Sequence, residues 1–114
     1  MVGGGMRQAG ILAAAGLYAL SHHIDRLADD HANAVRLAAG LSGIPGIHVD
    51  ETAVQTNMVF ARFDADMTAL VKHLAGQGIC ISPGSPVRLV THLDINTQDI
   101  DRAVAGFQSF RAEP

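Results

Sequence analysis

The stretch TNMVFARF at residues 56–63 decides the fold. Alternate side chains of an extended chain point to opposite sides, with Met58, Phe60 and Arg62 on one side and Val59, Ala61 and Phe63 on the other. Alternation of this kind, in a run with aromatic and β-branched residues, is typical of a strand with one buried face. The sequence therefore predicts a strand here, and the other elements can be placed around it.

Helix and strand patterns follow this strand along the chain. The predicted elements are a helix at residues 66–77, short strands at 79–81 and 87–90, and a last helix that begins at Asn96 and continues through Ile100, Val104, Phe107 and Phe110. Gly76 ends the first of these helices, and residues 82–86 form a loop by composition. Asp99 lies in the first turn of the last helix, where a carboxylate is favourable.

A helical pattern at residues 6–21 precedes the strand and is apolar on nearly all sides. Gly10 and Gly16 interrupt it, and their missing side chains allow another backbone to come close. We expect this helix to be buried. A chain of 114 residues needs a partner subunit or a further domain to cover it.

A second, amphipathic helical pattern follows it. Its apolar side recurs at steps of three and four, at Ile24, Leu27, Ala28, His31, Ala34, Val35, Ala38 and Leu41. The predicted outer face carries Asp25, Arg26, Asp29, Asp30, Asn33 and Arg36. Gly43 and Pro45 end the helix, and residues 44–47 form a turn.

The order of elements predicts an α+β fold: two long N-terminal helices, then a small, mainly antiparallel sheet covered by helices. We expect residues 1–45 to be interdomain or interface helices and residues 46–114 to form a small α+β C-terminal domain.

Composition excludes several classes of protein. The 8 basic and 11 acidic residues are scattered and give a net charge of −3, which argues against binding to nucleic acid. The apolar stretch 9–20 is too short to span a membrane and lacks the leucine-rich centre of a signal peptide. Cys80 is the single cysteine, so no disulfide forms within the chain, and a cytoplasmic location is expected.

Histidine and cysteine offer little chemistry in this pattern. His22, His23 and Asp25 are followed by Asp29, Asp30 and His31, but adjacent histidines diverge and the spacing fits no known ligand motif, so we predict no metal site. Cys80 lies in an apolar run with no local nucleophile motif. We expect it to be a small core residue.

Two arginines are the better candidates for binding an anion. Arg88 lies within the apolar run 86–90, where a buried guanidinium would need a paired anion and would suit a carboxylate. An internal salt bridge, or the exposed face of an edge strand, explains the same pattern. Arg7 follows three glycines at the start of a helix, where free N–H groups favour an anion; alternatively, it is a solvated residue after a flexible lead-in.

Three segments together resemble a known family: GGGMRQAG at residues 3–10, QTNMVF at 55–60, and RLVTHLD at 88–94. In this order and spacing they are similar to the C-terminal part of low-specificity L-threonine aldolases. The resemblance implies a fold-type-I pyridoxal-phosphate enzyme that cleaves threonine or allo-threonine to glycine and acetaldehyde, usually as a homo-oligomer. It also implies that Arg88 binds the substrate carboxylate and that Arg7 lies near the cofactor phosphate, across a subunit interface. Thr91, His92 and Asp94 are expected to hold the turn after the strand.

The family attaches its cofactor to a lysine, and pyridoxal phosphate then acts as an electron sink. Lys72 is the single lysine here, and nothing around it resembles the cofactor-lysine segment, so we expect a surface residue. The sequence thus predicts no catalytic residue in this chain, no covalently bound cofactor, and a partial threonine aldolase whose cofactor domain lies upstream. The alternatives are a non-catalytic α+β assembly or binding module and, less favoured, a stand-alone metal or thiol enzyme.

Overall fold

The computed structural model describes residue 5 and residues 7–110. Its elements, in chain order, are α1 (Gly10–His22), α2 (Leu27–Ser42), β1 (Ile47–Val49), the 3-10 helix η1 (Glu51–Ala53), β2 (Met58–Phe63), α3 (Met67–Ala75), β3 (Val87–Val90) and α4 (Thr97–Ser109). Methionine 6, which the sequence pattern assigned to the first helix, lies outside the described residues.

The sheet has three antiparallel strands in the order β1-β2-β3. The strand predicted at 87–90 is confirmed as β3, and the one predicted at 56–63 is confirmed as β2 from Met58 onward, since Thr56 and Asn57 lie in a turn. β1 was not predicted, because Pro45 and Gly46 directly before it gave the region the composition of a turn. The strand predicted at 79–81 is wrong: Ile79 and Ile81 pack against the edge of the core, but this segment joins no strand.

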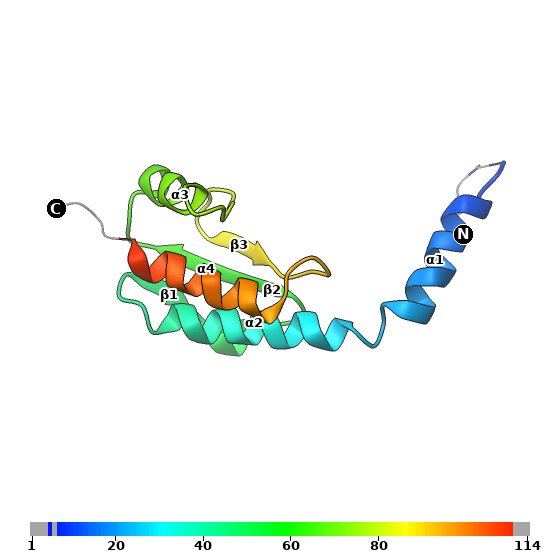
Figure 1. Cartoon of the computed structure of the whole chain (residues 1–114), viewed down its shortest axis with the longest axis horizontal. Helices are drawn as coiled ribbons and strands as arrows, with labels where there is room; N and C mark the ends of the chain where they lie inside the picture. Colours follow the sequence, from blue (N-terminus) through cyan, green and yellow to red (C-terminus); the bar gives the residue numbers. More distant parts are fainter. Residues whose placement is uncertain (1–4, 6, 111–114) are drawn as a thin grey trace.

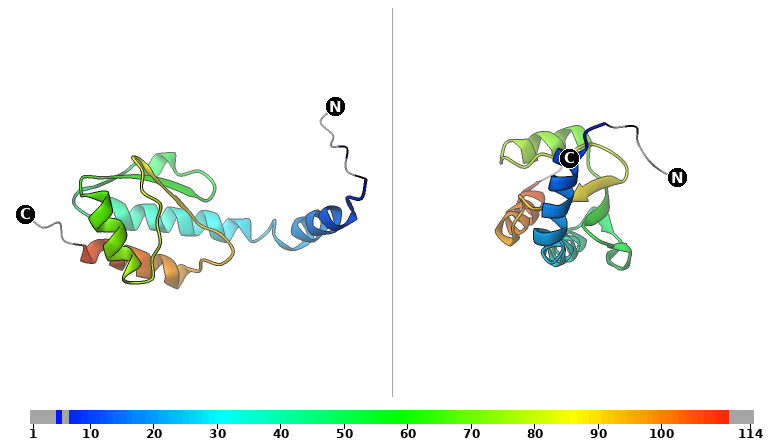
Figure 2. Two further views of the ribbon diagram at one scale, coloured as in Figure 1. Left: turned by 90° about the horizontal axis from the view of Figure 1, so that it is seen from above. Right: turned by 90° about the vertical axis from the view of Figure 1, so that its right-hand side faces the viewer.

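Three helices cover one face of the sheet. Figure 2 (right) shows α2, α3 and α4 on the same side of the strands, and Figure 1 shows α2 and α4 running alongside each other. The core between them contains Ala34, Leu37, Ala38, Leu41, Val59, Ala61, Leu70, Leu74, Val87, Leu89, Ile100 and Phe107. Phe63 and Phe107 stack across it, with ring centroids 5.4 Å apart. No helix of the described residues covers the other face of the sheet. The predicted α+β class is confirmed.

Side-chain caps explain where α3 and α4 begin. Asp66 accepts a hydrogen bond from the backbone N–H of Thr68 at 3.0 Å. Asn96 and Asp99 form a reciprocal capping box at the start of α4, with bonds of 2.8 and 3.0 Å. Short polar side chains at these positions bond to the N–H groups that a helix leaves free at its first turn.

The buried face of α2 differs from the predicted one. Leu37, Asp30 and Asn33 are buried, whereas Ile24 and Leu27, predicted to face inward, are exposed. Polar partners explain this correction: Thr91 donates its hydroxyl to the backbone carbonyl of Asp30, and Asn33 bonds to the loop before α4. Because Asp30 and Asn33 have hydrogen-bond partners in the interior, α2 packs with this side facing the rest of the fold.

α1 projects away from the rest of the molecule, as Figures 1 and 2 show, and makes the molecule 60 Å long but only 27 Å wide. None of its residues is buried, so the predicted burial of this helix does not occur within the described part of the chain. Its large side chains remain accessible, at Ile11, Leu12, Leu17, Tyr18 and Leu20. An uncharged helix that exposes so many apolar side chains is typical of an interface.

Candidate functional site

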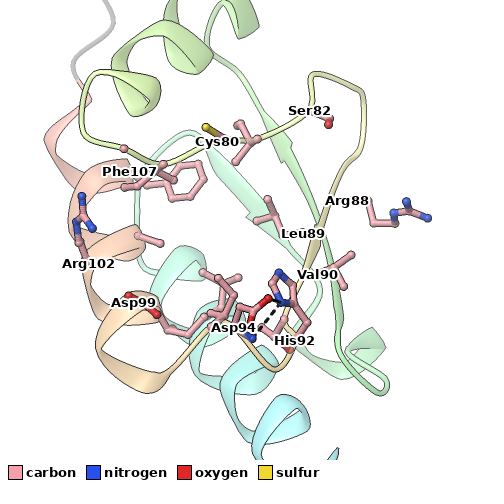
Figure 3. Close-up of a pocket in the computed structure, with 18 of the residues that line it drawn as sticks. Cys80, Ser82, Arg88, Leu89, Val90, His92, Asp94, Asp99, Arg102 and Phe107 are labelled. Carbon is pink, nitrogen blue, oxygen red and sulfur yellow. Dashed lines mark hydrogen bonds and ion pairs between the residues drawn. The ribbon is translucent and has the colours of Figure 1, made fainter. Parts of the chain in front are cut away.

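β3 places Arg88 on the uncovered face of the sheet. Val87 and Leu89 point into the core and Arg88 points outward, as the period of two requires. Figure 3 shows the guanidinium of Arg88 directed away from Leu89 and Phe107. The argument that Arg88 is buried is therefore wrong, and the alternative of an exposed face on an edge strand is correct.

The guanidinium groups in the described part of the chain divide into two sets. Those on the helices have partners: Arg26 bonds to Asp30, Arg36 bonds to Asp101, and Arg102 donates to the carbonyl of Gln77. Arg7, Arg62 and Arg88 have no hydrogen bond or ion pair with any described residue. A planar guanidinium without a partner is free to bind a carboxylate or phosphate through two parallel hydrogen bonds.

The surroundings of Arg88 on this face are largely apolar. Phe60 is its direct cross-strand partner, and Met58 and Val90 are exposed beside it. Arg62 lies one step further along β2 on the same face. An exposed apolar surface that carries unpaired guanidinium groups suits an anionic ligand whose remaining part is covered by another surface.

Arg62 was placed on the same side as Phe60 by the alternation of the strand, but it was not recognised as a candidate site residue. It borders a hollow of about 370 Å³ together with His48, Phe60 and Pro86. His48, its partner on β1, is held by Asp64, with His48 Nε2 2.9 Å from Asp64 Oδ1. The alternation along the strand, combined with the pairing of Phe60 and Arg88, would have placed Arg62 on the same exposed face as Arg88 and so identified it as a candidate.

Arg7 lies just before α1, and its side chain is exposed. α1 begins at Gly10, and its N-cap residue Ala9 provides no side-chain cap. The first turn also has no acidic residue, so the leading N–H groups of the helix are free of side-chain caps. This arrangement fits a bound anion. Because α1 projects away from the sheet, a single chain does not bring Arg7 and Arg88 together.

A hollow of about 740 Å³ lies along the free edge of β3, between that strand, α4 and the segment 78–83, and Arg88 and Val90 border it. Phe107, Leu89 and Ile100 line its inner wall, and Figure 3 shows Arg88 at its rim, with the guanidinium directed away from Phe107. Cys80 borders this hollow and is exposed, so the expectation of a core cysteine is wrong. Its neighbours Ile79 and Ile81 point inward instead, in the alternation of an extended chain.

The segment after β3 is held by local bonds, as expected. The backbone N–H of Asp94 donates to His92 Nδ1 at 3.3 Å, and the N–H of Ile95 donates to the carbonyl of His92 at 2.9 Å. Figure 3 shows His92 and Asp94 next to each other. Thr91 is buried and bonds to both α2 and the turn before β2.

The structure places the remaining candidates apart from Arg88. Lys72 is exposed on α3, as expected, and borders a separate hollow with Thr68 and Pro83. In the described ranges, no three His, Cys, Asp or Glu side chains lie close enough to hold a metal ion. His22 instead bonds to the carbonyl of Tyr18 and stacks on its ring. None of the helices between residues 7 and 110 has the length and apolar character that a membrane crossing requires.

Comparison with known proteins identifies the family. Residues 1–64 match the family model described as beta-eliminating lyase. The chain is 40% identical over 113 residues to the low specificity L-threonine aldolase of Escherichia coli O157:H7, covering 98% of this chain and 33% of that protein. It is 42% identical over 113 residues to low-specificity L-threonine aldolase 1 of Arabidopsis thaliana, covering 94% of this chain and 32% of that protein. It thus spans about a third of the length of these relatives.

Solved structures of lower identity share the fold. The cysteine desulfurase CsdA from Escherichia coli matches with a TM-score of 0.72 at 17% identity, over 94% of this chain and 31% of that chain. The cystine C-S lyase C-DES matches with a TM-score of 0.69 at 22% identity, over 90% of this chain and 29% of that chain. The resemblance inferred from the three sequence motifs is confirmed, and the chain belongs to the beta-eliminating lyase family.

Proposed function

We propose that this chain forms the substrate-carboxylate side of a pyridoxal-phosphate-dependent threonine aldolase and is inactive without the remainder of that enzyme. The complete enzyme would cleave L-threonine or L-allo-threonine to glycine and acetaldehyde. The observation that carries the proposal is the unpaired guanidinium of Arg88, on the uncovered face of a chain that matches threonine aldolases over 113 residues.

Arg88 would bind the α-carboxylate of the amino acid. Its position at the middle of β3 gives the side chain a rigid base, and its lack of an internal partner means that no ion pair has to be broken before the substrate binds. Phe60 and Val90 beside it would help to exclude water once the rest of the enzyme covers this face. Exclusion of water strengthens the interaction between guanidinium and carboxylate.

Arg7 and the uncapped start of α1 would bind the cofactor phosphate. Because α1 points away from Arg88, this contact would be made in a site that another subunit completes. The proposal therefore includes a homo-oligomer whose interface covers the apolar side chains of α1. The division into interface helices at residues 1–45 and a small domain at residues 46–114 stays a prediction. In this proposal α1 alone would form the interface, because α2 packs in the core of the small domain.

The residues of this chain fit the anionic groups of substrate and cofactor but not the covalent attachment of the cofactor. Pyridoxal phosphate supplies an electron sink when it is bound through a lysine. Lys72 is the single lysine, is exposed on α3, and shares no hollow with Arg88. We therefore assign carboxylate and phosphate binding to this chain, and the cofactor lysine to the remainder of the enzyme. A cytoplasmic location is part of the same proposal.

The test is a hybrid enzyme in which this chain replaces the matching third of the Escherichia coli threonine aldolase. We expect the hybrid to release acetaldehyde from threonine, and the chain alone with pyridoxal phosphate to release none. Borohydride reduction of the isolated chain should leave no cofactor on Lys72. Turnover by the isolated chain would contradict the proposal. A folded, cofactor-loaded hybrid without activity would favour the non-catalytic assembly module.

A further inference from the structure

Thr56 has an unusual backbone conformation. Its φ of 57° lies in the left-handed region, and among the described residues other than glycine it alone has a positive φ. A β-branched residue is disfavoured there, because Cβ approaches the following carbonyl oxygen. Thr56 occupies the first central position of the turn from Gln55 to Met58, which the N–H of Met58 closes onto the carbonyl of Gln55 at 3.4 Å. Glycine or asparagine would adopt this conformation with less strain.

The side chain and carbonyl of Thr56 are both engaged. His31 Nδ1 lies 3.1 Å from the carbonyl oxygen of Thr56, which ties the turn to α2. The hydroxyl of Thr56 donates to Oδ1 of Asn57 at 3.4 Å. The amide of Asn57 is then oriented so that its Nδ2 donates to the carbonyl of Thr91 at 2.7 Å. Thr56 therefore helps to orient the side chain of Asn57, and Asn57 is bonded to Thr91 directly after β3.

Every polar group of Thr91 makes a hydrogen bond. Its N–H donates to the carbonyl of Asn57 at 2.9 Å, its carbonyl accepts from Asn57 Nδ2, and its hydroxyl donates to the carbonyl of Asp30 at 2.7 Å. The residue is only 1% exposed. Thr91 stands three positions after Arg88 on the same extended segment, so bonds that hold Thr91 also limit the movement of Arg88.

We propose that the Thr56-Asn57 turn is a positioning device for Arg88, and that Thr56 and Asn57 are positioning residues. This inference rests on the proposed function, in which Arg88 binds the substrate carboxylate. A turn selected for stability alone would avoid a β-branched residue in the left-handed region. Strain of this kind persists where it contributes to the arrangement of a site. Here it aims the amide of Asn57 at Thr91 and holds the strand that carries Arg88 before the ligand arrives.

The test compares two substitutions in the full 114-residue chain. Thr56→Gly relieves the backbone strain and removes the hydroxyl, whereas Thr56→Ser keeps the hydroxyl and is the matched control. For Thr56→Gly we expect a melting temperature that is unchanged or higher, together with amide hydrogen exchange at Thr91 that is faster by about tenfold. For Thr56→Ser we expect exchange at Thr91 within about twofold of the original chain.

Two results on the chain itself would overturn the proposal. One is unchanged exchange at Thr91 in Thr56→Gly. The other is a lower melting temperature with equal acceleration at the core residue Leu41, since this would show a general contribution to stability instead of a local one. Neither measurement needs cofactor or substrate, so both are independent of the proposed function.

The active hybrid enzyme separates this proposal from the one on which it rests. Thr56→Gly should raise the KM for threonine with a smaller change in kcat, and Thr56→Ser should restore the original KM. If Arg88→Gln raises KM but Thr56→Gly does not, the positioning role is wrong and the role of Arg88 stands. If Arg88→Gln leaves KM unchanged, the proposed role of Arg88 is wrong, and the positioning role is wrong with it.

Discussion

Phe60 on β2 and Arg88 on β3 lie directly opposite each other on the uncovered face of the sheet. Three positions along the ladder, the N–H of Thr91 donates to the carbonyl of Asn57, so the alternation of an antiparallel ladder makes Phe60 and Arg88 a pair without backbone hydrogen bonds. Side chains of such a pair stand close together, with Cα atoms about 4.5 Å apart. Phe60 thus places an uncharged aromatic side chain opposite Arg88 on this face.

Arg88→Gln in the hybrid enzyme should raise the KM for threonine by a factor on the order of 10–100, because a hydrogen bond to a charged carboxylate contributes about 1.5–3 kcal/mol. Arg88→Lys keeps the charge and loses the two-bond geometry, so we expect an intermediate KM. Both variants of the isolated chain should melt close to the original temperature, since Arg88 has no partner among the described residues. Steady-state kinetics with threonine checks the first expectation, and a KM unaffected by either substitution would exclude the carboxylate role.

Leu41→Ala should destabilise the chain by about 2–5 kcal/mol, the usual cost of a cavity at a fully buried leucine. Leu41 lies on the buried side of α2 and is 0% exposed, whereas Leu12 on α1 is 62% exposed. Leu12→Ala is therefore the matched control and should change the unfolding free energy of a monomer by about 0.5 kcal/mol or less. Urea denaturation measures both. A large effect of Leu12→Ala that depends on protein concentration would show that α1 is buried in an oligomer.

Gly40→Ala tests the close packing of α2 on α4. A Cβ at position 40 would lie 2.7 Å from Cγ2 of Val104 and 3.0 Å from its Cγ1, which is closer than side-chain carbons approach. We expect a net loss of about 1 kcal/mol, because the crowding exceeds the gain in helix propensity.

In a Val104→Ala background, the same Gly40→Ala substitution should instead stabilise the chain by about 0.5–1 kcal/mol, because only the propensity gain remains. A double-mutant cycle by thermal or chemical unfolding measures this change of sign. Equal effects of Gly40→Ala in both backgrounds would show that α2 and α4 do not approach as described.

Acid should weaken the contact between α2 and α4 through Asp101. The hydrogen bond from Arg36, with Nε 2.7 Å from Oδ1, holds the pKa of Asp101 below its ordinary value of 3.8. Because the folded pKa is lower than the unfolded one, this stabilisation is present in full above the unfolded value and is lost as the pH falls through the folded value.

Arg36→Gln should therefore raise the pKa of Asp101 toward its ordinary value and make stability less dependent on pH in this acidic range. An NMR titration of the aspartate carboxyl carbons measures the shift. Asp50 is the internal control, because the Thr52 hydroxyl lowers its pKa without any contribution from Arg36. If the pKa of Asp101 stays low in Arg36→Gln, the ion pair is not its cause.

Local signals in the sequence were sufficient for much of the fold. The alternation in 56–63 correctly divided the side chains of β2 between its two faces, and the run 87–90 predicted the position of β3, because a period of two is a property of the extended chain itself. Asn96 predicted the start of α4 for a similar reason: a capping side chain acts within one turn of the helix. The sequence also identified Arg88 as a candidate, although its predicted burial is wrong.

Long-range contacts decided the rest. The same period of two at residues 79–81 predicted a strand that does not form, since pairing depends on the position of β3 and not on the segment alone. The inward face of α2 was misassigned because Asp30 and Asn33 are polar: the Asp30 carboxylate is paired with Arg26 one turn away, while the Asp30 carbonyl and the Asn33 amide bond to residues more than 60 positions away along the chain. Helical periodicity contains no information about such partners.

The amino-acid sequence by itself determined most of the helices and strands, the family, and the choice of Arg7 and Arg88 as candidates for binding an anion, because propensities, caps and motifs act over a few residues. Only the tertiary structure decided that Arg88 is unpaired on an open sheet face and that the strained Thr56 is bonded, through Asn57, to the end of the same strand. These features depend on contacts between residues that are far apart in the sequence. Such contacts form because packing the helices on one face of the sheet buries apolar surface, which is favourable in free energy.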